Sequence, residues 1–115
     1  MIFISYGMIV IRYHKFMFSH VVILWTKPEL PNASDVLIEG ANKYLKNIPG
    51  ILHFHIGKMV PYNGTIVDKS YQVGLNVIFI DKQARDTYEK HPSHIEFIER
   101  VFKPNGDKIL IYDFQ

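Results

Sequence analysis

Three segments of this chain are rich in β-branched and aromatic residues and carry apolar side chains at both odd and even positions. They are Ser19–Thr26, Tyr71–Ile80 and Lys108–Phe114. Runs of this composition predict β-strands. A strand with one face in water should alternate polar and apolar side chains, and these three do not. The sequence therefore predicts a sheet with two buried faces.

The first half of the chain adds a helix and a further strand. We expect Asn32 at the helix N-cap, because apolar residues follow it at the spacing of one helix face as far as Pro49-Gly50. A strand is then predicted over Ile51–Val60, and a turn or loop over Pro61–Gly64. This half reads as strand, helix, strand.

The second half repeats the pattern with a broken helix. Asp81 is predicted to cap a short helix that reaches Lys90, and Pro92 to open another that runs to about Phe102. A turn at Asn105-Gly106 leads into the last strand. The order βαββαβ predicts an α+β, ferredoxin-like fold, with an antiparallel four-stranded sheet and both helical segments on one face.

The uncovered face of this sheet points to a partner. A chain of 115 residues has the size of one domain and, apart from its first residues, no spare element for that face. We expect a second copy to cover it by sheet-to-sheet packing about a two-fold axis, as in a dimeric α/β-barrel. The alternative is that strands simply favour valine and isoleucine.

Charge and cysteine content exclude several classes of protein. The formal net charge is +2, and the basic residues are scattered, so we expect no nucleic-acid partner. The absence of cysteine excludes disulfides, thiolate zinc sites and a cysteine nucleophile, and it fits a cytoplasmic location. The sequence has no glycine-rich phosphate loop, and we predict no organic cofactor.

The first sixteen residues form an apolar extension ahead of the domain pattern. Residues 1–16 are shorter than the roughly 20 residues of a spanning helix, and their charges follow the apolar run, unlike those of a signal peptide. We therefore expect no membrane partner. The segment is either an extra strand or arm, or an artefact of start-codon choice with the natural start at Met17. The domain is predicted over residues 17–115.

A set of motifs in this order resembles the stress-responsive A/B barrel (Dabb) family. The resemblance covers about Phe18 to Phe114, and it implies a homodimer whose two sheets pack into a barrel. The residues that carry it are the opening His20-Val-Val-Ile-Leu-Trp25, Ile48-Pro49-Gly50, Gly57, Tyr71, the segment Tyr88-x-x-His91-Pro92-x-His94-x-x-Phe97 and the closing Asp113.

Olivetolic acid cyclase-type members of this family close a polyketide ring by an aldol-type reaction, using a histidine and a tyrosine of the same segment. The resemblance implies His94 and Tyr88 as the catalytic pair and His20 as a further cavity histidine. Val73 stands where that enzyme type has another cavity histidine, which puts a shared substrate in doubt. Many relatives have no established activity.

The residues themselves support an acid/base site in this segment. His94 heads a helical stripe of apolar residues, which turns its ring toward the apolar side, and imidazole suits proton transfer near neutral pH. Tyr88 supplies a hydroxyl for a carbonyl oxygen or enolate. The competing interpretation makes His94 a hydrogen-bonded core residue, Tyr88 a packing residue and His91 a helix cap. The residues predicted to contact substrate are His20, His91, Trp25, Val73 and Phe97.

Metal binding is a weaker alternative. His53 and His55 share one strand face, but no carboxylate stands at a recognisable partner spacing. We assign no metal ligands. If an ion binds, a loosely held Mg²⁺ or Ca²⁺ is favoured over zinc, because thiolates are absent.

The leading functional prediction is a homodimer with a small apolar pocket that binds or transforms a small aromatic or polyketide-like molecule by His/Tyr chemistry. One alternative is a non-catalytic, stress-related structural oligomer. Another follows the resemblance of the fold to small cofactor-free monooxygenases. An enclosed pocket of roughly 300 Å³ or more, reached by both His94 and Tyr88, would favour the enzyme.

Overall fold

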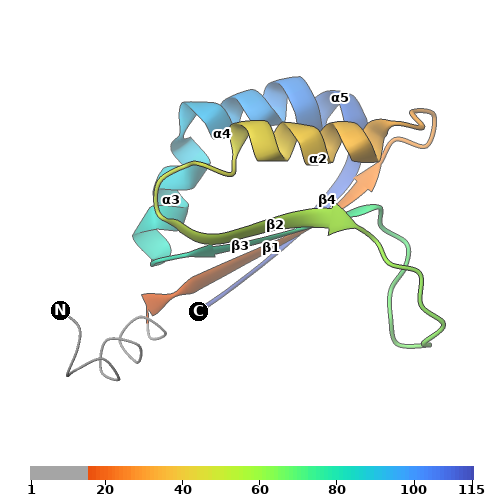
Figure 1. The fold of residues 1–115 in the computed structure, drawn as a ribbon, viewed down its shortest axis with the longest axis horizontal. Helices are drawn as coiled ribbons and strands as arrows, with labels where there is room; N and C mark the ends of the chain where they lie inside the picture. Colours follow the sequence, from red (N-terminus) through yellow and green to blue (C-terminus); the bar gives the residue numbers. More distant parts are fainter. Residues whose placement is uncertain (1–15) are drawn as a thin grey trace.

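The fold is a twisted four-stranded antiparallel sheet, and the helices between residues 33 and 105 lie on one face of it (Figure 1). A computed structural model describes residues 16–115, so the predicted extension, apart from Phe16, lies outside the described residues. The strand order β2-β3-β1-β4 confirms the ferredoxin-like prediction. The elements are β1 (Phe18–Thr26), α2 (Ala33–Tyr44), β2 (Ile51–Lys58), β3 (Val73–Phe79), α3 (Lys82–Lys90), α4 (Pro92–Phe97), the π-helix η1 (Ile98–Phe102), α5 (Lys103–Asn105) and β4 (Gly106–Phe114).

The two faces of the sheet follow from the alternation along β1. Its buried positions lie toward the helices and join one hydrophobic core with α2, α3 and α4. The residues between them, such as Val21 and Ile23, are half-buried and lie on the opposite side, called here the open face. The strand register carries both faces across the sheet, because Val21 pairs with Asn76 on β3 and with Tyr112 on β4.

Edge strand β4 is exposed along nearly its whole length. Ile109, Ile111 and Asp113 pair with Leu24, Val22 and His20 of β1, so they lie on the helix side of the sheet. The helices do not cover this strand fully, since Ile109 and Ile111 remain 39% and 44% exposed. The helix-side core is therefore open toward β4.

Helix α2 packs closely on the π-helix through a glycine. Gly40 is buried, and a Cβ atom built on it would lie 2.6 Å from Cγ1 of Val101. Only a residue without a side chain permits this approach. At the start of the helix, Asn32 occupies the predicted N-cap position but makes no side-chain cap hydrogen bond.

The predicted break in the second helical segment is present. Oδ1 of Asp81 accepts a hydrogen bond of 2.8 Å from the backbone nitrogen of Ala84 and caps α3. His91 then adopts an extended conformation (φ −65°, ψ 137°), as expected before proline. Nδ1 of His91 accepts a hydrogen bond of 3.0 Å from Ser93 N, which begins α4. The chain thus turns sharply between Tyr88 and His94.

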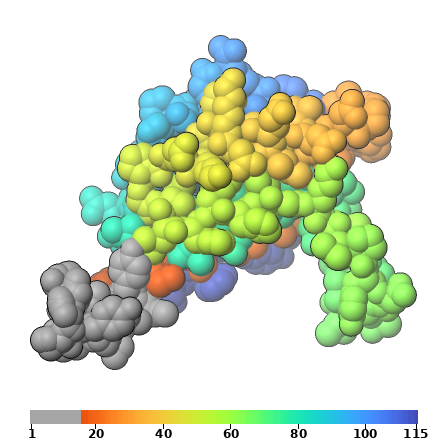
Figure 2. Space-filling view, in the orientation of Figure 1, coloured from red at the N-terminus to blue at the C-terminus, as the bar shows by residue number. Residues whose placement is uncertain are grey.

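Two boundaries differ from the sequence prediction. No separate turn lies at Asn105-Gly106, because α5 ends at Asn105 and β4 begins at Gly106. Asn105 itself closes the helix, since its Nδ2 donates a hydrogen bond of 2.9 Å to the carbonyl of Val101. The connection between β2 and β3 is also longer than predicted, since it spans residues 59–72. It projects from the body of the domain on the open-face side (Figures 1 and 2).

Candidate functional site

Three polar rings from three different elements meet between the sheet and the helices. Tyr88 of α3 lies in the middle, with ring centroids 5.9 Å from His20 of β1 and 4.8 Å from His94 of α4. Phe79 of β3 supports the tyrosine in an edge-on contact at 4.9 Å. The break at Pro92 is what brings Tyr88 and His94, six positions apart, to the same place.

These rings line a small cavity of about 90 Å³. Its polar end is formed by His20, Tyr88, Glu89 and His94. The cavity is smaller than the roughly 300 Å³ typical of ligand pockets, although both predicted catalytic residues line it. It borders the exposed side chains of β4, so a longer ligand has a route outward on that side. The apolar lining consists of Val22, Leu24, Leu45, Leu75, Phe97, Ile98, Ile109 and Ile111.

His20 is held by a carboxylate behind it. It is only 4% exposed, and its Nδ1 atom lies 2.6 Å from Oδ1 of Asp113. A carboxylate accepts hydrogen bonds, so Nδ1 is the donor in this pair and Nε2 is the ring nitrogen left for the cavity. The other carboxylate oxygen, Oδ2, accepts a hydrogen bond of 2.5 Å from Nη1 of Arg85.

Burial shifts the proton affinities of the other two rings. It lowers the pKa of His94 from its ordinary value; His20 and His91 act in the same direction, while Glu89 opposes them. It also raises the pKa of Tyr88, with a smaller contribution from the charge of Glu89. Near neutral pH, His94 is therefore a neutral proton acceptor and Tyr88 a protonated donor.

The other predicted contact residues divide into two groups. Phe97 lines the cavity. His91 caps α4 through Ser93, which matches the competing interpretation of that histidine. Val73 is completely buried in the core opposite Leu24 and is not among the residues that line this cavity.

Trp25 lies away from the cavity, contrary to its predicted place in the site. It follows Leu24 on β1 and therefore points to the other face of the sheet, because strand side chains alternate. There its Nε1 donates a hydrogen bond of 3.1 Å to Ser70, and Lys108 lies over its ring. It borders a separate groove of about 410 Å³ that also includes Lys27 and Asp107.

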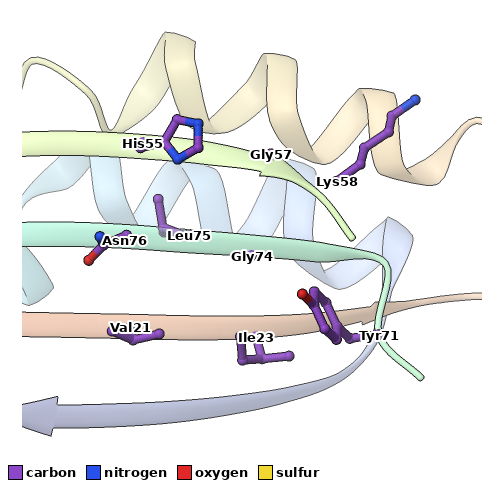
Figure 3. A pocket seen from close by; sticks show the side chains of 9 residues that line it. All are labelled: Val21, Ile23, His55, Gly57, Lys58, Tyr71, Gly74, Leu75 and Asn76. Carbon is purple, nitrogen blue, oxygen red and sulfur yellow. The ribbon is translucent and has the colours of Figure 1, made fainter. Parts of the chain in front are cut away.

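The histidine pair of β2 is not part of the site either. His53 and His55 are exposed, and in the described part of the chain no three His, Cys, Asp or Glu side chains converge as metal ligands would. His55 instead borders a hollow of about 230 Å³ on the open face (Figure 3). The hollow exists because Gly57 and Gly74 pair on neighbouring strands and leave a gap beside Tyr71.

Three residues at the site, Asp113, Arg85 and Glu89, were not among the site residues predicted from the sequence. Asp113 was noted only as part of the family resemblance. Its position two residues after Ile111 places a carboxylate on an otherwise apolar side of β4. Arg85 and Glu89 carried no such signal. Both stand one turn or less from Tyr88 on a polar helix, where charged residues usually lie in water.

The arrangement defines a class of protein: a two-layer α+β domain with a histidine- and tyrosine-lined cavity between its layers and an apolar open sheet face. The chain belongs to the Stress Responsive A/B Barrel Domain (Dabb) family, whose sequence pattern matches residues 18–115. Comparison with curated protein sequences finds no match.

Solved structures share the fold. A Dabb family protein with a ferredoxin-like fold from Mesorhizobium loti is 26% identical, with a TM-score of 0.72 over 87% of this chain and 96% of that one. A dimeric ferredoxin-like protein from Jannaschia is 25% identical, with a TM-score of 0.68 over 86% and 98%. A hydroxynitrile lyase from Passiflora edulis, 17% identical, has a TM-score of 0.69 over 86% and 92%.

Proposed function

We propose that this protein is a homodimer that catalyses proton transfer on a small carbonyl compound bound between the sheet and the helices. The observation that carries the proposal is the group of His20, Tyr88 and His94 at the polar end of one cavity. A neutral imidazole and a protonated phenol are the two groups that enolisation requires.

The reaction follows from the state of each ring. Neutral His94 removes a proton from the carbon next to the ligand carbonyl, and the electron pair moves into an enolate. Tyr88 donates a hydrogen bond to the enolate oxygen, where the negative charge develops. The enolate carbon then attacks a second carbonyl of the ligand and forms a carbon–carbon bond. The imidazolium of His94 returns its proton to the new alkoxide, so the site ends as it began.

The dimensions of the cavity suggest how a ligand would bind. A space of about 90 Å³ accommodates a carbonyl head group, whereas an aromatic or polyketide-like body needs more room. The exposed side chains of Ile109 and Ile111 offer an apolar surface for that body at the edge of the sheet. The site thus fits a small aromatic or polyketide-like molecule with a reactive carbonyl at one end.

A hydroxynitrile lyase is among the solved structures that share this fold, and at 17% identity it supports the fold of the proposal and not its chemistry. We retain carbonyl enolisation as the proposal because it needs only the groups that line the cavity.

The proposed dimer uses the open face. Strands β1 and β4 present apolar side chains there, including Val21, Ile23 and Leu110, and several similar structures are described as dimeric. Packing two such faces together would bury them, as in other two-sheet structures. None of the helices in the described range 16–115 is long and apolar enough to span a membrane. A cytoplasmic location remains part of the proposal.

Hydrogen exchange of ketones tests the chemistry without knowledge of the natural substrate. A panel of small aromatic ketones is incubated with the protein in heavy water, and loss of the protons next to the carbonyl is followed by NMR. We expect exchange faster than in buffer for the ketones that also raise the melting temperature. His94→Gln should abolish the acceleration. Equal rates with and without protein across the whole panel would favour the non-catalytic oligomer.

A further inference from the structure

Arg85 lies behind the candidate site and is surrounded by partners. It stands on α3, one turn before Tyr88, and its side chain is only 14% exposed. Its guanidinium lies over the ring of Phe18, with Cζ 4.5 Å from the ring centroid. Its Nε contacts Oδ1 of Asp86 at 3.0 Å, and Nη1 contacts Oδ2 of Asp113 at 2.5 Å. The oxygen Oε1 of Glu89 is farther away, 3.9 Å from Nε.

Asp113 depends on this contact for its orientation. It is the second-last residue of edge strand β4, a strand with exposed side chains along most of its length. Its two oxygens are divided between two partners, Oδ1 with His20 and Oδ2 with Arg85. A carboxylate held at both oxygens cannot rotate without breaking one of the two charge-assisted contacts.

Arg85 supplies a positive charge on the Oδ2 side of Asp113, and it also faces the carboxylates of Asp86 and Glu89. The other oxygen of Asp113, Oδ1, accepts a hydrogen bond from Nδ1 of His20. Nε2 is then the nitrogen of the His20 ring that is left for a ligand in the cavity.

We propose that Arg85 is a positioning residue that acts through Asp113 to hold His20 in one tautomer, with the proton on Nδ1 and the lone pair of Nε2 available to a ligand. This inference rests on the proposed function for its significance, because the cavity is the site of that function. Its ligand-free readout is independent, since a ring tautomer can be measured in the protein alone.

A purely structural role for Arg85 makes a different prediction. Removing a purely structural ion pair would change only the free energy of unfolding. A positioning role changes the state of His20 as well. The chain offers a matched control in Lys82, which lies on the same helix and pairs with Asp86 but does not contact Asp113.

The test uses imidazole nitrogen NMR of His20 in the full-length protein, with Arg85→Met as the variant and Lys82→Met as the control. Methionine keeps an apolar stem against Phe18 and removes the fork of donors. We expect the Nδ1–H tautomer alone in the parent protein and in Lys82→Met, and a mixture in Arg85→Met. Where ketone exchange is measurable, its rate should fall about tenfold or more in Arg85→Met, as for other residues that orient a functional histidine.

The pathway through Asp113 is tested by a double variant. Asp113→Asn by itself should disturb the tautomer, and adding Arg85→Met should then change the His20 signals no further. A pure Nδ1–H tautomer in Arg85→Met would overturn the proposal, and so would a further change in the double variant. If Arg85→Met does not fold, Arg85→Lys replaces it, because one ammonium cannot contact Asp113 and Asp86 in the same fork. An undisturbed tautomer in Arg85→Lys would then be the contradicting result.

The two proposals fail separately. A parent protein that accelerates no ketone exchange contradicts the proposed function but leaves the tautomer result standing. An active parent protein whose His20 tautomer is indifferent to Arg85 contradicts only the positioning role.

Discussion

Nδ1 of His20 lies 2.6 Å from Oδ1 of Asp113, although 93 positions separate the two residues in the chain. The contact is made by the sheet, since His20 and Asp113 are paired directly across β1 and β4. Cross-strand neighbours on the same face lie about 5 Å apart at their Cβ atoms, which is within reach of an imidazole and a carboxylate. The first and last strands of the domain thus supply the two members of one dyad.

Replacing Asp113 by asparagine should destabilise the protein and loosen His20. The substitution removes the charge from a contact shared by His20 and Arg85, and leaving buried donors poorly paired costs about 1–3 kcal/mol. Urea unfolding measures the loss, and Asp107→Asn, an exposed change on the same strand, is the control. An unfolding free energy for Asp113→Asn equal to that of the control would contradict the importance of the dyad.

Tyr88 permits a separation of packing from chemistry. Tyr88→Phe removes only a hydroxyl that makes no side-chain hydrogen bond within residues 16–115, so stability should change little, while ketone exchange should fall about a hundredfold. Tyr88→Ala should cost about 3–5 kcal/mol instead, because the ring is 1% exposed. Unfolding and exchange are measured on both variants. Full exchange activity in Tyr88→Phe would remove the hydroxyl from the mechanism.

The lowered pKa of His94 predicts a stability change at mildly acidic pH. Because burial disfavours the protonated ring in the folded protein, the unfolded chain binds more protons between the lowered pKa and about 6.5. Stability should therefore be retained above about 6.5 and decrease as the pH falls through that window. Unfolding free energies of the parent and His94→Gln are compared across it. The variant should show a smaller decrease, and parallel curves would contradict the assignment.

The raised pKa of Tyr88 predicts the opposite behaviour in alkali. Its phenol should stay protonated in the folded protein above the ordinary value of about 10, since burial disfavours the phenolate. Stability from this group is therefore complete below about pH 10 and decreases as the pH rises above it. Because the Tyr88 phenol stays protonated, tyrosinate absorbance near pH 10 should increase by the same amount in the folded parent and in Tyr88→Phe. A smaller increase in the variant than in the parent near pH 10 would show that the Tyr88 phenol ionises normally.

The open face predicts a dimer that a single charge disrupts. Light scattering of the parent should give twice the 13.5 kDa mass of the chain. Ile23→Asp places a carboxylate in the middle of that face, and burying it unpaired should raise the dimer Kd at least about a hundredfold. Val36→Asp, on the exposed side of α2, should leave the dimer unchanged. A monomeric parent protein would overturn the proposed architecture.

Much of the fold could be predicted because its signals are local. The Asp81 cap and the Pro92 break are set by neighbouring backbone groups, and the two-sided apolar strands by composition. The boundary at Asn105-Gly106 was predicted less well, since Asn105 uses its side chain to close a helix instead of forming a turn. The length of the β2–β3 connection was missed for a related reason, because strand pairing ends where the partner strand stops.

The candidate site could be predicted only in part. His94 and Tyr88 belong to one short segment, and their meeting follows from the break between them. Trp25 was placed on the wrong side of the sheet, because a strand that is apolar on both faces does not reveal which face a given residue occupies. Val73 lies on the helix side, yet it packs in the core away from the cavity lining.

The sequence by itself determined the order of elements, the ferredoxin-like class, the family and the broken helix that carries Tyr88 and His94, because each depends on residues close together in the chain. Only the tertiary structure decided that β1 and β4 join His20 to Asp113, that Arg85 holds the far oxygen of that carboxylate, and that the cavity is about 90 Å³. Those properties depend on strand register and on packing between residues far apart in the chain. Local patterns of composition and spacing do not predict strand register or the packing of residues that are far apart in the chain.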